Sequence, residues 1–332
     1  MRRFVLLVSC TSFAMAGALT ATPHAVARGQ CGNLHEIVIA GVTTCTHGGD
    51  EPVPDLTPST NSRSLSGRSI PAAPCPGDGH TGRRIRVVLG YPSDTAGPDV
   101  ATARRAIRDT IAIADHNLDD QSTSIGQHYR FWCKRDRGVT INVVAMAPIG
   151  KDGTYTFTDV ANALGAAGFK DPKFVYSAFV ANIDCCYPYG GQGSLAVDDQ
   201  PDPASNANNA AFTRYSMIRF DAGLSTTSLA LAFQHEVGHN LGAVQDSAPH
   251  TSGAFHCYET YDVMCYNDGG PYFVGGGQLV SVCGDPSTSG LYAFDCGGDD
   301  YYNVAPAANT YLSDHWNVAN SRWLTPVGAS GR

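Results

Sequence analysis

Lysine is scarce in this chain, and basic clusters are missing altogether. The 332 residues contain only four lysines, no run rich in lysine and arginine occurs, and the formal net charge is −8. An acidic chain of this kind lacks the electrostatic footprint of proteins that bind nucleic acid or anionic membrane surfaces. We therefore expect no nucleic-acid partner, and no membrane partner for the mature protein.

Several sequence fingerprints of other enzymes are also missing. No P-loop, no G-x-S-x-G elbow and no dinucleotide-binding glycine pattern is present, so these chemistries are disfavoured. No apolar run reaches the ~20 residues that a transmembrane helix needs. The N-terminus instead combines Arg2 and Arg3 with an uncharged stretch over 4–19 and a small-x-small site at 25–27. This pattern predicts a signal peptide over residues 1–27 and a secreted, extracellular protein.

Cysteine, in contrast, is plentiful. Eleven cysteines occur, and ten remain after the signal peptide. An even number in an exported chain indicates disulfides. Connectivity does not follow from the sequence, but proximity suggests three pairs, and adjacent Cys185 and Cys186 should have different partners. The suggested pairs are Cys31–Cys45, Cys257–Cys265 and Cys283–Cys296.

The chain divides into a short N-terminal part and one large domain. Residues 28–83 hold a cysteine-containing segment followed by a linker rich in proline, serine and glycine, and this part could serve as a propeptide. Residues 84–332 are long enough for one sizeable core.

Strands and helices are expected to alternate in the large domain. Apolar runs bounded by turn signals predict strands, helical spacing predicts helices, and their alternation indicates a mostly parallel sheet in an α/β fold. We also expect a short edge strand over 194–197 after a glycine-rich loop at 190–193, and a C-terminal helix over 311–324. The other strands are expected at 84–91, 138–148, 173–183 and 213–221, and helices after Pro98 and over 159–168.

A further helix carries an H-E-x-x-H motif, and Ser225, Thr226 or Thr227 should cap it. Its apolar residues recur every four positions and make one stripe, which faces away from His235 and His239. These two histidines lie four residues apart, so they project from one side of the helix and can bind one ion. The stripe consists of Leu229, Phe233, Val237 and Leu241.

The motif has the chemistry of a catalytic zinc site. Zinc accepts imidazole nitrogen in a tetrahedron, and a catalytic site keeps one position for water. Glu236, next to the first ligand, is placed to take the proton of a water molecule that attacks a peptide carbonyl. We therefore predict a zinc-dependent endopeptidase with Glu236 as general base, acting on protein or peptide substrates.

"HEVGHNLG" at 235–242, followed by "YDVMCY" at 261–266, resembles the metzincin clan of zinc endopeptidases. Secreted actinobacterial metalloproteases share similar segments. The resemblance implies that Gly242 turns the chain after the helix, that Met264 forms an apolar floor beneath the metal, and that Tyr266 helps to stabilise the oxyanion. It also implies a mixed, mostly parallel sheet with an antiparallel edge strand, an active-site helix and an irregular, disulfide-rich C-terminal subdomain.

The third metal ligand departs from the metzincin pattern. Gln245 stands where metzincins place histidine or aspartate, and neutral glutamine is a poor zinc ligand. Asp246, His250, Glu259 and His256 compete for the role. Archaemetzincins have a ligand histidine, a cysteine directly after it and a methionine eight residues after the histidine. The chain resembles them in this spacing at His256, Cys257 and Met264, and the resemblance implies that His256 is the third ligand. We expect His256, and the other three remain open as alternatives.

Three further expectations concern the surroundings of the site. The exposed backbone at 193–197 would pair antiparallel with an extended substrate. Asp295, Asp299 and Asp300 could bind Ca²⁺ through their carboxylates. The misplaced third ligand also leaves an alternative function, a secreted binding or adhesion protein whose zinc site is structural or decayed. The sequence determines neither the substrate preference nor the oligomeric state.

Overall fold

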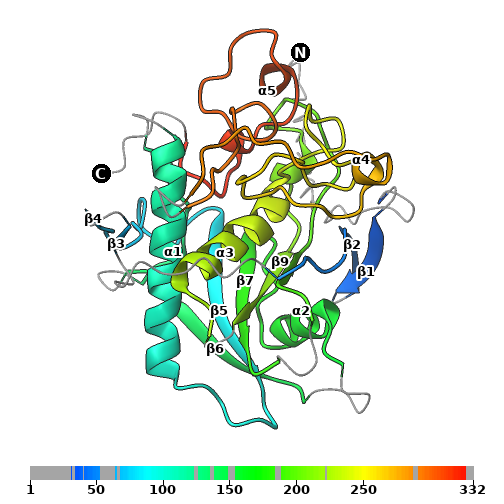
Figure 1. Cartoon of the computed structure of the whole chain (residues 1–332). Coiled ribbons are helices and arrows are strands. Elements are labelled where there is room, and N and C mark those ends of the chain that lie inside the picture. The colour runs from blue at the N-terminus through cyan, green and yellow to red at the C-terminus, as the bar shows by residue number, and fades with distance from the viewer. Residues whose placement is uncertain are drawn as a thin grey trace, which may run out of the picture.

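The computed structural model describes residues 31, 34–39, 41–52, 64–65, 68–122, 126–134, 138–148, 154–183, 188–220, 223–286 and 291–326 (Figure 1). The predicted signal peptide, Cys185 and Cys186 lie outside the described residues. Within these ranges, no helix is both long and apolar enough to cross a membrane.

A five-stranded sheet forms the centre of the fold, with strand order β6-β5-β7-β9-β8. Four strands are parallel, and the short edge strand β8 runs antiparallel to β9. This confirms the predicted α/β class with a mixed, mostly parallel sheet and an antiparallel edge. The strands are β5 (Arg84–Pro92), β6 (Ile141–Met146), β7 (Phe174–Ala181), β8 (Gly191–Gly193) and β9 (Arg214–Phe220).

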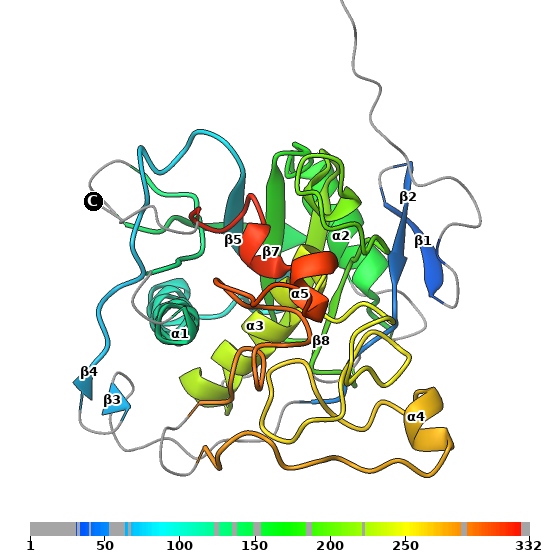
Figure 2. The ribbon, with the colours of Figure 1, turned by 90° about the horizontal axis from the view of Figure 1, so that it is seen from above.

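Helices cover both faces of this sheet. Alternate residues of β5 enter two separate clusters: Val87 and Leu89 pack in the cluster that contains α1 and α3, and Val88 packs in the cluster of α2. Every residue of β7 is buried, as expected for a central strand of a parallel sheet. Figures 1 and 2 show α1 and α3 side by side. The helices are α1 (Val100–Gln121), α2 (Phe157–Ala166) and α3 (Thr226–Leu241).

Local signals explain where α3 begins and ends. Ser225 is the N-cap, and its side chain accepts a hydrogen bond from the Ser228 backbone N–H. Gly242 ends the helix with φ 84°, a left-handed conformation that glycine adopts without strain. A side chain at Gly242 would also overlap the amide of Asn208. Two separate constraints, the positive φ and this close contact, therefore favour glycine at this position.

The N-terminal segment forms structure that the sequence did not reveal. Strands β1 (His35–Ile39) and β2 (Val42–Thr46) make an antiparallel hairpin, and the Cys31–Cys45 disulfide closes it. A second small hairpin joins β3 (Ser64–Leu65) to β4 (Arg68–Ser69). After β2 the chain continues along the free edge of the central sheet, towards the C-terminal half of α3.

The described residues between 242 and 326 are largely irregular and rich in disulfides, as predicted. Cys257–Cys265 and Cys283–Cys296 form as expected from proximity, whereas Cys75–Cys133 was not foreseen. The short helical elements here are α4 (Pro271–Val274), α5 (Tyr311–Asp314) and a 3₁₀ turn, η3 (Val318–Asn320); a further 3₁₀ turn, η2, covers Ala207–Asn209.

Two sequence predictions need correction. The single helix expected over 311–324 is wrong, because His315 is extended (φ −130°, ψ 179°) and buried Trp316 donates its indole N–H to the Leu241 carbonyl. The edge strand also lies earlier than expected, at Gly191–Gly193. Glycine weakens strands in general, but here close contact with α3 leaves no room for a larger residue.

Candidate metal centre

Three histidines from two parts of the chain converge beside α3. His235 and His239 lie one turn apart on the helix, and their Nε2 atoms are 3.2 Å apart. His256 reaches the same point from the loop that follows Gly242. Its ring centroid lies 5.2 Å from that of His235 and 5.0 Å from that of His239. All three side chains are buried.

Hydrogen bonds orient two of these rings. His235 Nδ1 lies 2.7 Å from the Val263 carbonyl oxygen, and His256 Nδ1 lies 2.9 Å from Asp268 Oδ2. An imidazole that donates its Nδ1–H in this way presents the lone pair of Nε2, as metal-ligating histidines do. Nε2 of His256 is buried and faces Asp50 Oδ1 at 3.0 Å.

The other candidates for the third ligand lie elsewhere. The Gln245 amide donates to the Gly242 carbonyl and accepts from the Asp198 N–H, so it holds the loop together. Asp246 accepts the Phe255 N–H. His250 and Glu259 face each other in a separate cluster.

Met264 lies directly against α3. A Cβ atom at Gly238 would come within 2.6 Å of the Met264 sulfur. The sulfur therefore fills the space that a side chain at position 238, next to His239, would need. The Cys257–Cys265 disulfide connects the chain just after His256 to the residue after Met264. The floor and the third histidine are therefore held in one short, cross-linked unit.

Glu236 is buried against the edge strand. A Cβ at Gly191 would overlap Glu236 Oε1, and a Cβ at Gly193 would lie 2.7 Å from the Glu236 carbonyl oxygen. The two glycines thus create the space that the carboxyl group occupies. Burial, and then repulsion from Asp50, raises the pKa of Glu236 well above its usual value. A nearby dication would oppose both effects by stabilising the carboxylate.

Two residues that the sequence analysis missed complete the cluster. Asp50 Oδ1 lies 3.0 Å from His256 Nε2 and 3.4 Å from His235 Nε2. The ring of His47 lies 4.0 Å from that of His239, centroid to centroid, and its Nδ1 is 3.5 Å from Asp50 Oδ1. The only local signal was a histidine and an aspartate three residues apart, close after a cysteine.

Three distances between these atoms are of the size found between zinc ligands. Zinc–nitrogen and zinc–oxygen bonds of about 2.0–2.1 Å place the corners of a tetrahedron about 3.3 Å apart. His235 Nε2 lies 3.2 Å from His239 Nε2, and Asp50 Oδ1 lies 3.4 Å from His235 Nε2 and 3.0 Å from His256 Nε2. Ligand atoms of His47, Asp50, His239 and His256 also lie within 4.8 Å of one another. Nitrogen and carboxylate oxygen are ligands that zinc accepts, so these buried histidine and aspartate side chains could hold a metal ion.

The backbone on either side of Asp50 pairs with the edge strand. The Asp50 N–H donates to the Gly191 carbonyl (3.0 Å), the Gly190 N–H donates to the Asp50 carbonyl (2.8 Å), and the Leu195 N–H donates to the Cys45 carbonyl (3.0 Å). The pairing is antiparallel. The chain's own residues 45–50 thus occupy the edge at which we expected an extended substrate.

Tyr266 also contacts Asp50. Its hydroxyl donates to Asp50 Oδ1 at 2.7 Å, and its ring centroid lies 4.6 Å from that of His256. Burial, and then the negative charge of Asp50, raises the pKa of Tyr266, so the phenol keeps its proton and remains a donor.

A cavity of about 140 Å³ opens next to Glu236. Leu231, Ala232, Val263 and Tyr292 give it apolar walls, and Asp50 with the two residues after it forms part of its boundary. The cavity therefore lies between the active-site helix and the N-terminal segment.

Comparison with known proteins gives a distant structural likeness. No family model matches the sequence, and no curated protein matches it. Among solved structures, two crystal forms of wild-type OgpA from Akkermansia muciniphila resemble this chain, with sequence identities of 12% and 11% and a TM-score of 0.31. Each match covers 77% of this chain and 70% of that chain.

Proposed function

We propose that this protein is an exported zinc endopeptidase of metzincin type. The observation that carries the proposal is the cluster of three buried histidine rings beside a buried glutamate. His235, His239 and His256 would hold the zinc. Glu236 follows the first ligand, and Met264, which packs against Gly238, would form the apolar floor.

The residues of the site have complementary roles in peptide hydrolysis. When bound, zinc would polarise the scissile carbonyl and acidify water. Glu236 would accept the proton of the attacking water and deliver it to the leaving amine. Tyr266 would donate its hydroxyl hydrogen to the carbonyl oxygen as that oxygen gains charge. The edge strand β8 would align an extended substrate through backbone hydrogen bonds, and the apolar cavity would accept an apolar side chain.

We further propose that the N-terminal segment keeps the enzyme latent. Residues 45–50 pair with the edge needed for substrate, and Asp50 takes the metal position that a catalytic site reserves for water. The disulfide of this segment, Cys31–Cys45, lies wholly within it. A cut after Pro52 would therefore free residues 28–52 without reduction of that bond.

We propose a processing site before Ile70 rather than at residue 83. Ile70 is 2% exposed and packs in the core. Cys75 is bound to Cys133, and buried Arg84 donates to the Pro76 carbonyl. Residues 70–83 therefore belong with the peptidase domain.

The test uses the chain from residue 28 with a site for a specific protease inserted within 53–63. We expect one catalytic zinc per chain before and after the cut, and casein hydrolysis only after it. Glu236→Ala, treated identically, should bind zinc and stay inactive. The proposal would be contradicted if the cut wild-type chain, separated from residues 28–52, holds zinc and hydrolyses nothing.

One observation favours the alternative, a secreted binding protein with a structural zinc site. With Asp50 included, four protein ligands surround the metal position, and structural zinc sites are closed in this way. A buried glutamate with no ligand role would then be unexplained. The experiment separates the two, because a structural site should lose zinc or stability when residues 28–52 leave.

A further inference from the structure

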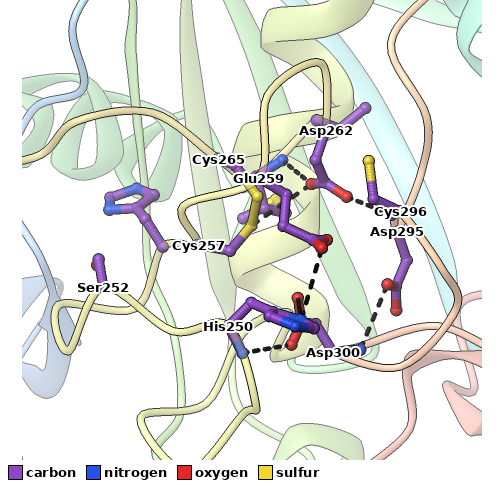
Figure 3. The surroundings of a disulfide bond; sticks show 12 residues. His250, Ser252, Cys257, Glu259, Asp262, Cys265, Asp295, Cys296 and Asp300 are labelled. Carbon is purple, nitrogen blue, oxygen red and sulfur yellow. Dashed lines mark hydrogen bonds and ion pairs between the residues drawn. A yellow bond between two sulfur atoms is a disulfide. The ribbon is translucent and has the colours of Figure 1, made fainter. Parts of the chain in front are cut away.

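A second cluster of ligand-type side chains lies apart from the three histidines. It comprises His250, Glu259, Asp299 and Asp300, and one ligand atom from each lies within 4.8 Å of the others. His250 Nδ1 is 3.2 Å from Asp300 Oδ2, 3.6 Å from Glu259 Oε1 and 3.8 Å from Asp299 Oδ1. Figure 3 shows the side chains of His250, Glu259 and Asp300 pointing toward one another beside the Cys257–Cys265 disulfide.

The cluster holds more negative charge than its own residues can balance. Three carboxyl groups face one imidazole, and both Glu259 and Asp300 are only 1% exposed. Within the described ranges, His250 is the one basic side chain in an ion pair with them. A buried carboxylate without a counter-charge is strongly unfavourable.

Unsatisfied atoms point to a missing ligand at this place. Glu259 Oε2 is buried without a hydrogen-bond partner, and so is Asp299 Oδ1. Buried carboxylate oxygens are rarely left in this state unless a cation or water completes them. The loose spacing around His250 Nδ1 agrees with this, since only Asp300 lies within ordinary hydrogen-bond reach.

We propose that His250, Glu259, Asp299 and Asp300 bind a second divalent transition-metal ion, zinc by the chemistry of the ligand set. One imidazole nitrogen and three carboxylate oxygens form a closed set of four, as in structural zinc sites. Calcium takes oxygen ligands only, and the histidine at the centre of the cluster disfavours it.

The calcium site predicted from the sequence is different, because it groups Asp299 and Asp300 with Asp295. Asp295 accepts backbone hydrogen bonds from the same loop. Its carboxylate receives the N–H groups of Asp299 and Asp300 at 3.2 and 3.3 Å, and also that of Tyr301 at 2.6 Å. Asp295 thus shapes the loop that presents the other two aspartates.

The position of the cluster gives the ion a structural role. His250 belongs to the loop that leads from α3 to His256, Glu259 lies two residues after Cys257, and Asp300 comes from the C-terminal region. Asp300 Oδ1 also accepts the His250 N–H at 2.8 Å. An ion here would tie three irregular segments together behind the third ligand of the first site.

The experiment counts zinc by mass spectrometry on the secreted chain, after metal removal and reloading with zinc alone. The wild type should bind two zinc ions, and Glu259→Gln should bind one. His315→Gln is the matched control, because His315 contacts Asp199 (3.7 Å) and the Tyr311 carbonyl (3.0 Å), outside the cluster, and this variant should bind two. Equal zinc in Glu259→Gln and wild type would overturn the proposal.

A second variant keeps the two sites distinguishable and does not depend on how Glu259→Gln folds. His235→Ala/His239→Ala removes the first site, so one zinc should remain, with an anomalous diffraction peak between His250 and Asp300. No zinc in this variant would overturn the second site while leaving the proposed peptidase untouched. Retention of calcium instead of zinc at the cluster would likewise overturn the assignment.

Discussion

Oδ1 of Asp50 lies 3.0 Å from Nε2 of His256, although the two residues are far apart in the sequence. This contact joins the N-terminal segment to the histidine that we propose as the third ligand. Tyr266 donates to the same carboxylate oxygen. In the proposed peptidase, a single side chain would therefore obstruct the metal position and occupy the oxyanion donor.

Removal of this carboxylate should weaken latency. In the uncleaved chain, we expect Asp50→Ala to raise casein hydrolysis by at least about tenfold, the effect of about 1.4 kcal/mol of lost binding. Full activity should still require the cut, because residues 45–50 remain tethered to the edge strand. Glu51→Ala, at the exposed neighbouring position, should leave the precursor inactive. If the uncleaved Asp50→Ala chain hydrolyses casein no faster than the uncleaved wild type, this role of Asp50 is contradicted.

Glu236→Gln should separate metal binding from catalysis. The amide keeps the shape of the side chain but cannot accept the proton of water, so kcat of the cut enzyme should fall by about 10²–10⁴-fold. The zinc content should stay at the wild-type value. Peptidase kinetics and metal analysis on the same sample check both parts, and a Glu236→Gln enzyme with near-normal kcat would exclude Glu236 as the base.

Asp268 orients His256, and its loss should weaken the metal site. Asp268→Asn replaces a charged acceptor of the imidazole N–H, and such partners typically contribute 10–100-fold to metal affinity, so we expect a loss of about that size. Competition with a chromogenic zinc chelator measures it. Asp120→Asn also removes a carboxylate that pairs with a histidine, His116, but on the surface of α1. Unchanged affinity in Asp268→Asn would argue against His256 as a ligand.

Gly191 leaves the space that Glu236 needs. A Cβ there would overlap Glu236 Oε1, so Gly191→Ala should displace the base and lower kcat by about 10²-fold, as small misplacements of catalytic groups do. Gly284→Ala is a matched control, because a Cβ at Gly284 meets nothing within 4 Å. Equal kcat values in the two variants would show that Glu236 tolerates the methyl group.

Most of the central fold could be predicted from local patterns. The strands around Val87, Phe179 and Ile218 are apolar runs between turn signals, and alternation with helices implies parallel pairing. The cap at Ser225 and the turn at Gly242 follow from side-chain chemistry and backbone conformation. These features depend on residues close in sequence, which is why the sequence alone reveals them.

The parts that escaped prediction depend on contacts between distant segments. Asp50 reaches the metal position only because the chain after β2 pairs with the edge strand, and backbone pairing of that kind leaves no side-chain pattern. Gly191 was assigned to a loop because glycine disfavours strands. In the structure it lies in the edge strand, because a larger residue there would overlap the Glu236 carboxyl group. His250 was a plausible ligand for the first site until the loop path placed it beside Glu259 and Asp300.

The final prediction concerns the start of the peptidase domain. Chains beginning at residues 70 and 84, both carrying Glu236→Gln to prevent self-digestion, should differ in stability. The shorter chain lacks buried Ile70 and the Cys75–Cys133 disulfide, and it leaves the Arg84 guanidinium without the Thr81 and Pro76 carbonyls. A disulfide that closes a loop of this length contributes about 4 kcal/mol in the chain-entropy account.

We therefore expect the melting temperature of the shorter chain to be lower by on the order of 10 °C, from ~2–4 °C for each kcal/mol in a domain of this size. Calorimetry at equal zinc loading measures the difference. Cys75→Ala/Cys133→Ala in the longer chain isolates the disulfide, and its melting temperature should fall between the two because Ile70 and the Arg84 contacts remain. Equal melting temperatures for all three would move the boundary back to residue 83, since residues 70–83 would then add nothing to the folded domain.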